Sequence, residues 1–196
     1  MGQVKSKVNN IASNVQQGNR HSRINNIVIA NVPEKKEEKI PEMIIKLGEY
    51  LNVEITKGDI DKTHRVNSFN KNQPKPTVAR LVTNIKKTEL MTALRDHFKN
   101  GNNLTARSLG IADDSYIFVN HHLASHMAGL HAGLRKLRKD HPFKLGYYED
   151  STIWVLLANQ ERSTFIKNEG DFVSLCSKLG ADPRKFLRED HTRETD

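Results

Sequence analysis

Hydrophobic residues recur along the first half of the chain at the spacings of short strands and helices. The run from Ile24 to Val32 is rich in β-branched residues and ends at Pro33, which is typical of a buried strand. Intervals of three and four predict helices over 41–53 and 85–99, the second with an inner face of Leu90, Met91, Leu94 and Phe98. A weaker strand pattern occupies 59–66, and two further strands are predicted over 78–82 and 116–119. The order β-α-β-β-α-β predicts one antiparallel sheet with two helices on one face.

A second unit is expected after residue 123. Ser125 is the expected cap of a helix with an apolar face of Met127, Leu130, Leu134 and Leu137, and Pro142 ends it. A hairpin is predicted from strands at 145–148 and 153–158, followed by a short helix over 171–179. The chain therefore divides into a polar N-terminal tail, a first domain, a C-terminal domain and a charged tail, over 1–22, 24–123, 124–180 and 181–196. Both domains are expected to be of the α+β class.

The polar N-terminal tail has two features of interest. Four apolar residues within 4–15 are spaced 4, 3 and 4 apart, as in a coiled-coil seam, but two heptads predict only weak self-association. The first residues also match a myristoylation pattern that would place an acyl group on Gly2, and only with that group is membrane attachment expected.

Composition limits the compartment and the class of partner. The 196 residues hold 31 Lys and Arg against 23 Asp and Glu, a net charge of +8, which favours a polyanionic partner. No apolar run is long enough for a membrane span, and no signal-peptide core is present. Cys176 is the single cysteine, so a disulfide framework is excluded. A cytoplasmic or nuclear protein that is not secreted is expected.

The strongest candidate for binding chemistry is a group of cations at the end of the 125–140 helix. Since the leucines of this helix face inward, its cations must project outward, and a lysine and a tyrosine follow in the hairpin. Such a surface suits phosphates and stacked bases, although a merely solvated helix face has the same appearance. The candidate residues are Arg135, Lys136, Arg138, Lys139, Lys144 and Tyr147.

Two further arginines lie on predicted strands of the first domain. Arg65 ends one strand and Arg80 lies on the next, so each is a candidate phosphate contact or simply a surface charge. The sheet lacks the aromatic signature run of the common RNA-recognition motif, so base stacking on it is expected to be poor.

No catalytic or metal-binding motif is found. His122 and His126 have helical i, i+4 spacing, but no third ligand follows at a known spacing, and HExxH, P-loop and G-x-S-x-G patterns are absent. Cys176 lies in an apolar helical stretch, which predicts an inert buried thiol. We therefore expect no enzyme, no cofactor and no metal.

A series of short motifs over 24–175 resembles two related groups of proteins. The motifs are Asn25-Asn26-Ile27-Val28-Ile29, His64-Arg65-Val66, Ile117-Phe118-Val119-Asn120, Ile153-Trp154-Val155 and Asp171-Phe172. In order and spacing they resemble the baculovirus few-polyhedra protein family and the first-open-reading-frame proteins of long interspersed retrotransposons. The resemblance implies a coiled coil, a noncanonical domain like the RNA-recognition motif (RRM-like) and a small C-terminal domain.

The same resemblance implies a function. The retrotransposon proteins bind single-stranded nucleic acid as trimers and act as its chaperones. This chain has Leu156-Leu157 where the family often carries a basic pair, and its seam is shorter. We therefore expect a non-enzymatic protein that binds single-stranded RNA or DNA. The alternative is a viral structural or trafficking protein that acts at membranes or on protein partners.

Overall fold

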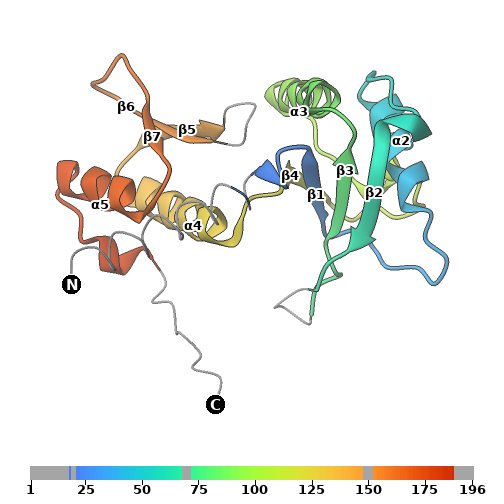
Figure 1. Ribbon diagram of the computed structural model, residues 1–196, viewed down its shortest axis with the longest axis horizontal. Helices are drawn as coiled ribbons and strands as arrows, with labels where there is room; N and C mark the ends of the chain where they lie inside the picture. Colours follow the sequence, from blue (N-terminus) through green and yellow to red (C-terminus); the bar gives the residue numbers. More distant parts are fainter. Residues whose placement is uncertain (1–17, 19–20, 68–71, 148–151, 188–196) are drawn as a thin grey trace. The chain divides into compact units, whose positions relative to one another are not determined.

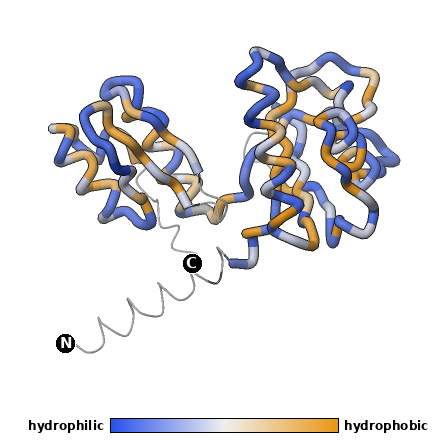
Figure 2. The backbone as a smooth tube through the Cα atoms, turned by 90° about the horizontal axis from the view of Figure 1, so that it is seen from above, coloured by the Kyte–Doolittle hydropathy of each residue, from blue (hydrophilic) through white to orange (hydrophobic). Residues whose placement is uncertain are grey.

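The structure is a computed structural model that describes residues 18, 21–67, 72–147 and 152–187. Contacts along the chain divide it into two compact units, with the boundary between His122 and Leu123. Each unit combines helices with an antiparallel sheet, which confirms the α+β class (Figure 1). Hydrophobic and hydrophilic stretches alternate along the chain in both units (Figure 2).

The first unit is built on a four-stranded antiparallel sheet in the order β2-β3-β1-β4. Its strands are β1 (Asn26–Ala30), β2 (Ile60–Arg65), β3 (Thr77–Leu81) and β4 (Phe118–His121). Its helices are α2 (Ile40–Tyr50), α3 (Asn84–Lys99) and the short 3-10 turns η1 (Lys57–Asp59) and η2 (Ala106–Leu109). The fourth strand starts two residues later than expected, because Tyr116 forms only an isolated bridge to Thr105.

One face of this sheet packs against both helices in a single core. Ile27 and Ile29 of β1 are at most 1% exposed, and they share this core with Leu47 of α2 and Leu90 of α3. Since side chains alternate along a strand, Val28 points to the opposite face, together with its register partners Val78 and Asn120. The helices therefore leave one face of the sheet uncovered, and this face also carries His64 of β2 and the exposed Phe118 of β4 at its two edges.

The inner face of α3 differs from the sequence prediction. Phe98 was expected to point inward, but it is 41% exposed and lies edge-on to His97, with the two ring centroids 5.9 Å apart. Lys87 is instead buried at 1% exposure, and its Nζ donates a hydrogen bond to the Ile24 carbonyl at 2.5 Å. This carbonyl lies immediately before β1, so a polar side chain occupies a position that hydrophobic periodicity assigns to apolar residues. Thr83 caps the helix by accepting the Lys86 amide hydrogen at 3.2 Å.

The second unit packs two helices on one face of a three-stranded antiparallel sheet (Figure 1). The sheet order is β5-β6-β7, from Phe143–Tyr147, Ile153–Leu157 and Thr164–Ile166. The helices are α4 (Ser125–Asp140) and α5 (Glu169–Lys178), followed by the 3-10 turn η3 (Pro183–Lys185). Four α4 side chains pack with Val155 and Phe172 in its core, and they are the predicted Met127, Leu130, Leu134 and Leu137.

Three details of the second unit correct the sequence prediction. The strand β7 was missed, because three residues are too few to show a periodic pattern. Helix α4 has Ala124 at its N-cap position, so Ser125 is its first residue and not its cap. Phe186, which the sequence placed in a charged tail, is 8% exposed and packs in the second core.

Candidate nucleic-acid interface

The α4 cations occupy one side of their helix. Since successive residues turn by about 100°, Arg135, Arg138 and Lys139 lie on the flank away from Gly133, whereas Lys136 lies one turn after Gly133 on its side of the helix. Gly133 marks the side next to α5, where an added Cβ would lie 3.2 Å from the Phe172 ring. All four cations are exposed, and none forms a hydrogen bond or an ion pair with a residue that the structure describes. Their charges are therefore available to a ligand.

This flank of α4 borders the edge strand β5. His131, one turn before Arg135, packs its ring against Tyr147 at the end of β5, with the centroids 5.0 Å apart. Burial, and then the charges of Arg135 and Arg138, lower the pKa of His131 from its usual 6.5 to about 4. The ring is thus neutral at pH 7, and the positive charge on this flank belongs to the arginines and lysines.

Tyr147, a predicted stacking residue, lies partly in the core. Its side chain is half-buried and packs against the second hydrophobic cluster, and burial raises the pKa of its phenol. In this position the Tyr147 ring packs against the His131 ring of α4. The structure thus brings Tyr147 close to His131 and Arg135, in a position that differs from an open stacking surface.

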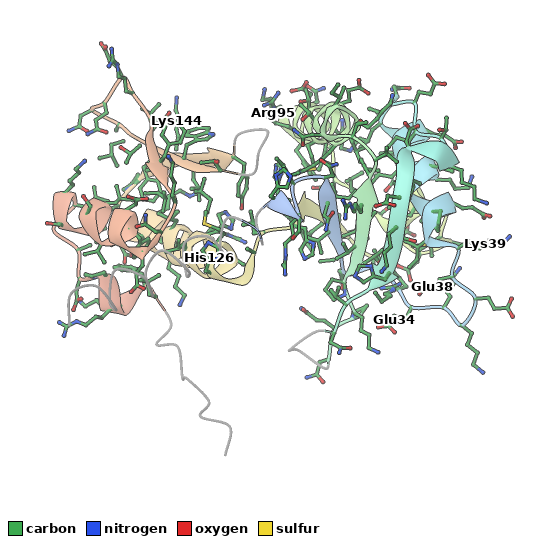
Figure 3. The ribbon with its side chains drawn as sticks, in the orientation of Figure 1. Glu34, Glu38, Lys39, Arg95, His126 and Lys144 are labelled. Atoms are coloured by element: carbon green, nitrogen blue, oxygen red, sulfur yellow. The ribbon has the colours of Figure 1, made fainter. Side chains whose placement is uncertain are left out.

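Lys144 lies on the other face of the second sheet. Phe143 points into the core, so the next side chain of β5 points to the side away from α4 and α5 (Figure 3). Lys144 is exposed and stands opposite Leu156 of β6 in the strand register. The predicted phosphate-binding cations of the second unit therefore lie on two surfaces, α4 and the outer face of the sheet.

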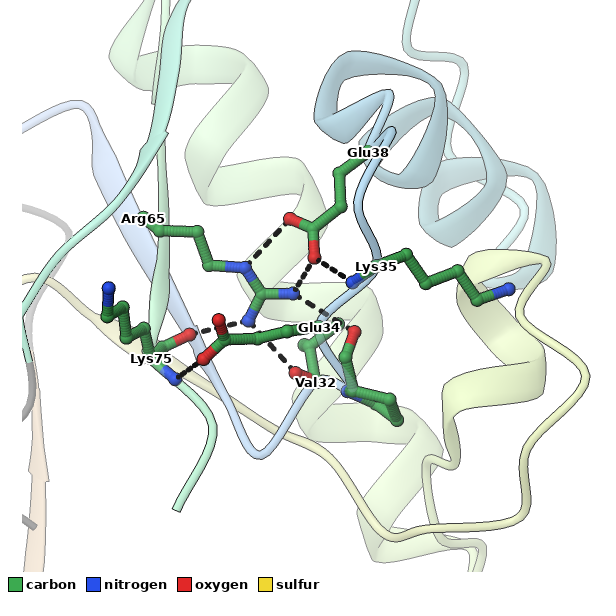
Figure 4. A network of polar contacts seen from close by, with 7 residues as sticks. Val32, Glu34, Lys35, Glu38, Arg65 and Lys75 are labelled. Carbon is green, nitrogen blue, oxygen red and sulfur yellow. Dashed lines mark hydrogen bonds and ion pairs between the residues drawn. The ribbon is translucent and has the colours of Figure 1, made fainter. Parts of the chain in front are cut away.

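The structure gives Arg65 a different role from the phosphate contact suggested by the sequence. The side chain is 13% exposed and forms an ion pair with Glu38, also 13% exposed, at 2.7 Å (Figure 4). Its Nε donates to the second oxygen of Glu38 at 2.9 Å. The remaining hydrogens reach three backbone carbonyls, those of Val32, Lys75 and Pro33.

All five N–H donors of the Arg65 guanidinium are therefore used within the first unit. The hydrogen bond from Arg65 also lowers the pKa of the Glu38 carboxyl. This network ties the end of β2 to the loop before α2. We therefore treat Arg65 as a structural residue of the fold, because it has no donor left for a phosphate.

Arg80 is intermediate between the unpaired α4 cations and the fully bonded Arg65. It lies on the face of the first sheet away from the helices, and its Nε is 3.1 Å from a carboxylate oxygen of Asp61. Both side chains are about half exposed. A ligand could reach the Arg80 guanidinium, but its charge is already compensated by that carboxylate.

Sequence reasoning missed two residues on the outer face of the second sheet. Phe165 of β7 is 44% exposed, and the Nζ of Lys167 lies 5.7 Å from the centre of its ring. Phe165 is the register partner of Trp154 in β6. The sequence did not point to these two residues because β7 itself was not predicted. Phe165 could therefore not be assigned to a face of the sheet.

His122 and Cys176 are both accounted for by contacts within the fold. Within the described ranges, no three His, Cys, Asp or Glu residues converge as a metal site would require. His122 Nε2 accepts a hydrogen bond from the Arg23 guanidinium at 3.2 Å, its Nδ1 lies 3.2 Å from the Asn26 side-chain amide, and burial lowers its pKa to about 4. Cys176 is fully buried in α5, and burial raises the pKa of its thiol, which disfavours a reactive thiolate.

The predictions for Gly2 and for the seam over 4–15 fall on residues outside those that the structure describes. No helix within the described residues is long and apolar enough to cross a bilayer. No protein-family model matches the chain, and a search of curated proteins finds no match.

Proposed function

We propose that this protein binds single-stranded nucleic acid without acting as an enzyme, and that the cationic flank of α4 is its main phosphate-binding element. The observation that carries this proposal is the state of the four α4 cations. They are adjacent and exposed, and the described residues offer them no carboxylate partner. Arg65 and Arg80, by contrast, are both paired with acids.

The α4 flank is suited to phosphates for an energetic reason. An ion pair within the protein must be broken before its cation can bind a phosphate, whereas the α4 cations have no such pair to lose. Each phosphate that they neutralise releases condensed counterion, about 0.7 ion per contact on a single strand. Lys144 extends the positive surface across the β5 edge.

The arrangement of the first unit supports a second part of this proposal, a noncanonical RRM-like domain. The order β2-β3-β1-β4, fully antiparallel, with two helices in one core, agrees with the split-βαβ topology expected for such a domain. The sheet face away from the helices carries Val28, Val78 and Asn120 at its centre. The rings on this face, His64 and Phe118, lie apart on the edge strands β2 and β4. Arg80 on the same face is paired with Asp61, so phosphate binding is assigned to the second unit.

A retrotransposon-type nucleic-acid chaperone is the biological role that we propose. The motifs that carry the resemblance fall on structural elements: His64-Arg65 ends β2, Phe118-Val119-Asn120 begins β4, and Ile153-Trp154-Val155 begins β6. The coincidence of these motifs with strands, together with the positive flank of α4, supports the proposed chaperone role.

A binding titration with matched charge variants tests the proposal. The first variant replaces Arg135, Lys136, Arg138 and Lys139 by alanine. The control replaces four exposed lysines of the first unit, Lys35, Lys36, Lys46 and Lys57, which removes the same charge from another surface. The affinity of each for a labelled single-stranded oligonucleotide is measured by filter binding at constant salt.

We expect the α4 variant to lose at least tenfold in affinity, and the control variant to lose much less. The loss should be similar for oligonucleotides of different sequence, because phosphate contacts carry no base information. If both variants lose the same small factor, net charge alone drives binding and the α4 flank is only a solvated helix face.

A further inference from the structure

The outer face of the β5-β6-β7 sheet carries side chains that the core does not use. Side chains alternate along each strand, and Ile153, Val155 and Ile166 point into the core at 0% exposure. Their neighbours therefore point outward. In register, these are Lys144 opposite Leu156, and Gly146, Trp154 and Phe165 in one row across the three strands.

Gly146 leaves room for the Trp154 indole to lie close against strand β5. A Cβ atom added at Gly146 would lie 2.5 Å from Trp154 Cζ2 and 2.7 Å from Cε2. Any other residue at this position would push the ring away. The indole is consequently held against the sheet surface in a half-buried position, which fixes its orientation before any ligand binds.

Phe165 extends the row beyond Trp154. It is 44% exposed, and the ammonium of Lys167 lies 5.7 Å from its ring centre. In the next register row, Lys144 and Leu156 line a hollow of about 390 Å³ that also reaches Phe143 and Leu157 of the inner face. The outer face thus carries two aromatic rings, with Lys167 beside Phe165 and Lys144 two residues before Gly146.

From this arrangement we infer that the outer face of the second sheet is a stacking platform for the bases of a single-stranded nucleic acid. The inference rests on the proposed function and adds the surface that receives the bases. Flat rings accept any base, and lysines beside them complement the charge of the connecting phosphates. Lys144 links the platform to the β5 edge, whose other side is bordered by the α4 cations.

The platform differs from the first sheet in a way that favours this assignment. On the outward face of the first sheet, the rings of His64 and Phe118 lie on the two edge strands β2 and β4, and the strands between them carry Val78 and Val28. The row Gly146, Trp154 and Phe165 provides two rings on neighbouring strands. Adjacent strands are about 4.8 Å apart, so both rings can contact consecutive groups of one ligand strand.

The single tryptophan makes a direct test possible. Since Trp154 is the only tryptophan in the chain, its fluorescence reports contacts at the platform without background. The full-length protein is titrated with single-stranded oligothymidylate and, separately, with an abasic oligonucleotide of equal length and charge. Binding itself is followed by the anisotropy of an end-labelled copy of each oligonucleotide.

A matched pair of variants accompanies the titration. Phe165→Ala removes the ring at the end of the row, and Phe98→Ala removes a phenylalanine of similar exposure, 41%, in the first unit. Both side chains are exposed enough for the fold to tolerate their loss. Truncation of a stacking residue should lower the affinity by about 5-fold to 100-fold. Phe165→Ala should therefore weaken thymidylate binding at least 5-fold, whereas Phe98→Ala should leave it unchanged.

The expected result is a saturable change of Trp154 fluorescence with thymidylate, at the same midpoint as the anisotropy, and weaker binding of the abasic strand. If the anisotropy shows tight binding while Trp154 fluorescence and the Phe165→Ala variant show no effect, the platform is wrong and the proposed function stands. If the anisotropy shows no binding of either strand, the proposed function fails, and the platform fails with it.

Discussion

Arg65 in the first unit and Arg135 in the second are both arginines close to a strand, and both are candidates for phosphate binding from the sequence. Their surroundings are opposite. Arg65 is 13% exposed, and its guanidinium is bound by Glu38 and three backbone carbonyls. Arg135 is exposed, and the described part of the chain gives it no hydrogen bond or ion pair. One arginine holds the fold together and the other is available to a ligand.

The position of acidic residues in space decides the role of each cation. Glu38 lies 27 residues before Arg65 in the chain, yet it forms the ion pair that removes Arg65 from the surface. On α4 the cations follow one another without an acid until Asp140 ends the helix. A count of basic residues treats both regions alike, whereas their hydrogen-bond partners separate them.

Replacing Arg65 by alanine removes the hydrogen-bond network of the first unit and should cause the largest loss of unfolding free energy. The change leaves the Glu38 carboxylate without its partner at a mostly buried position and removes a donor from three carbonyls. Loss of one member of such a pair costs about 3–5 kcal/mol. Urea unfolding followed by far-UV circular dichroism measures it.

Arg80→Ala is the matched control for this prediction. Its ion pair with Asp61 is half exposed, and exposed pairs contribute about 1 kcal/mol or less. Equal losses of unfolding free energy in the two variants would show that Arg65 is no more structural than Arg80, and the comparison between the two regions would lose its basis.

The pH dependence of the unfolding free energy tests the packing of His131 in α4. The pKa of His131 falls from 6.5 in the unfolded chain to about 4 in the folded protein, mainly by burial. The unfolded state therefore binds more protons between these values. The stabilisation is fully present above pH 6.5 and is lost as the pH falls towards 4, by about 2 kcal/mol between pH 7 and pH 4.5.

His131→Phe keeps a ring against Tyr147 and removes the titrating group. The unfolding free energy of this variant should fall less than that of the parent protein between pH 7 and pH 4.5, by about 2 kcal/mol. Carboxyl groups titrate in the same range in both proteins, so the difference between them isolates His131. An identical pH profile for both would place His131 in solvent and contradict its packing.

A pair of glycine substitutions, with smaller expected effects, tests the close contact between Gly146 and the Trp154 ring. Gly146→Ala would place a Cβ 2.5 Å from the Trp154 ring, so the ring must move, at a cost of about 1–2 kcal/mol. Gly129→Ala, on the open side of α4, meets no atom within 4 Å and should stabilise the helix by about 0.5–1 kcal/mol. Thermal unfolding measures both, and a stabilised Gly146→Ala variant would refute the close contact with Trp154.

Much of the fold could be predicted, because hydrophobic periodicity records which faces are buried. The strands around Ile27 and Val155 and the inner face of α4 were found in this way. The prediction failed where a polar side chain replaces an apolar one in the core, as Lys87 does through its bond to the Ile24 carbonyl. It also failed for β7, whose three residues carry no periodic signal.

The candidate site was predictable only in part. The α4 cations follow from the helix pattern, since the leucines define the inner face and leave the charges outside. The network of Arg65 depends on Glu38 and on carbonyls from two other segments, and no local pattern reveals such partners. The outward row of Trp154 and Phe165 requires the strand register, which the sequence does not contain.

The salt dependence of single-strand binding tests the central claim most directly. For the parent protein and for the variant with Arg135, Lys136, Arg138 and Lys139 replaced by alanine, the logarithm of the affinity is measured against the logarithm of the salt concentration. We expect the slope to be shallower by about three units in the variant, since each lost phosphate contact removes about 0.7. An unchanged slope in a folded variant would contradict the claim that the α4 cations contact phosphates.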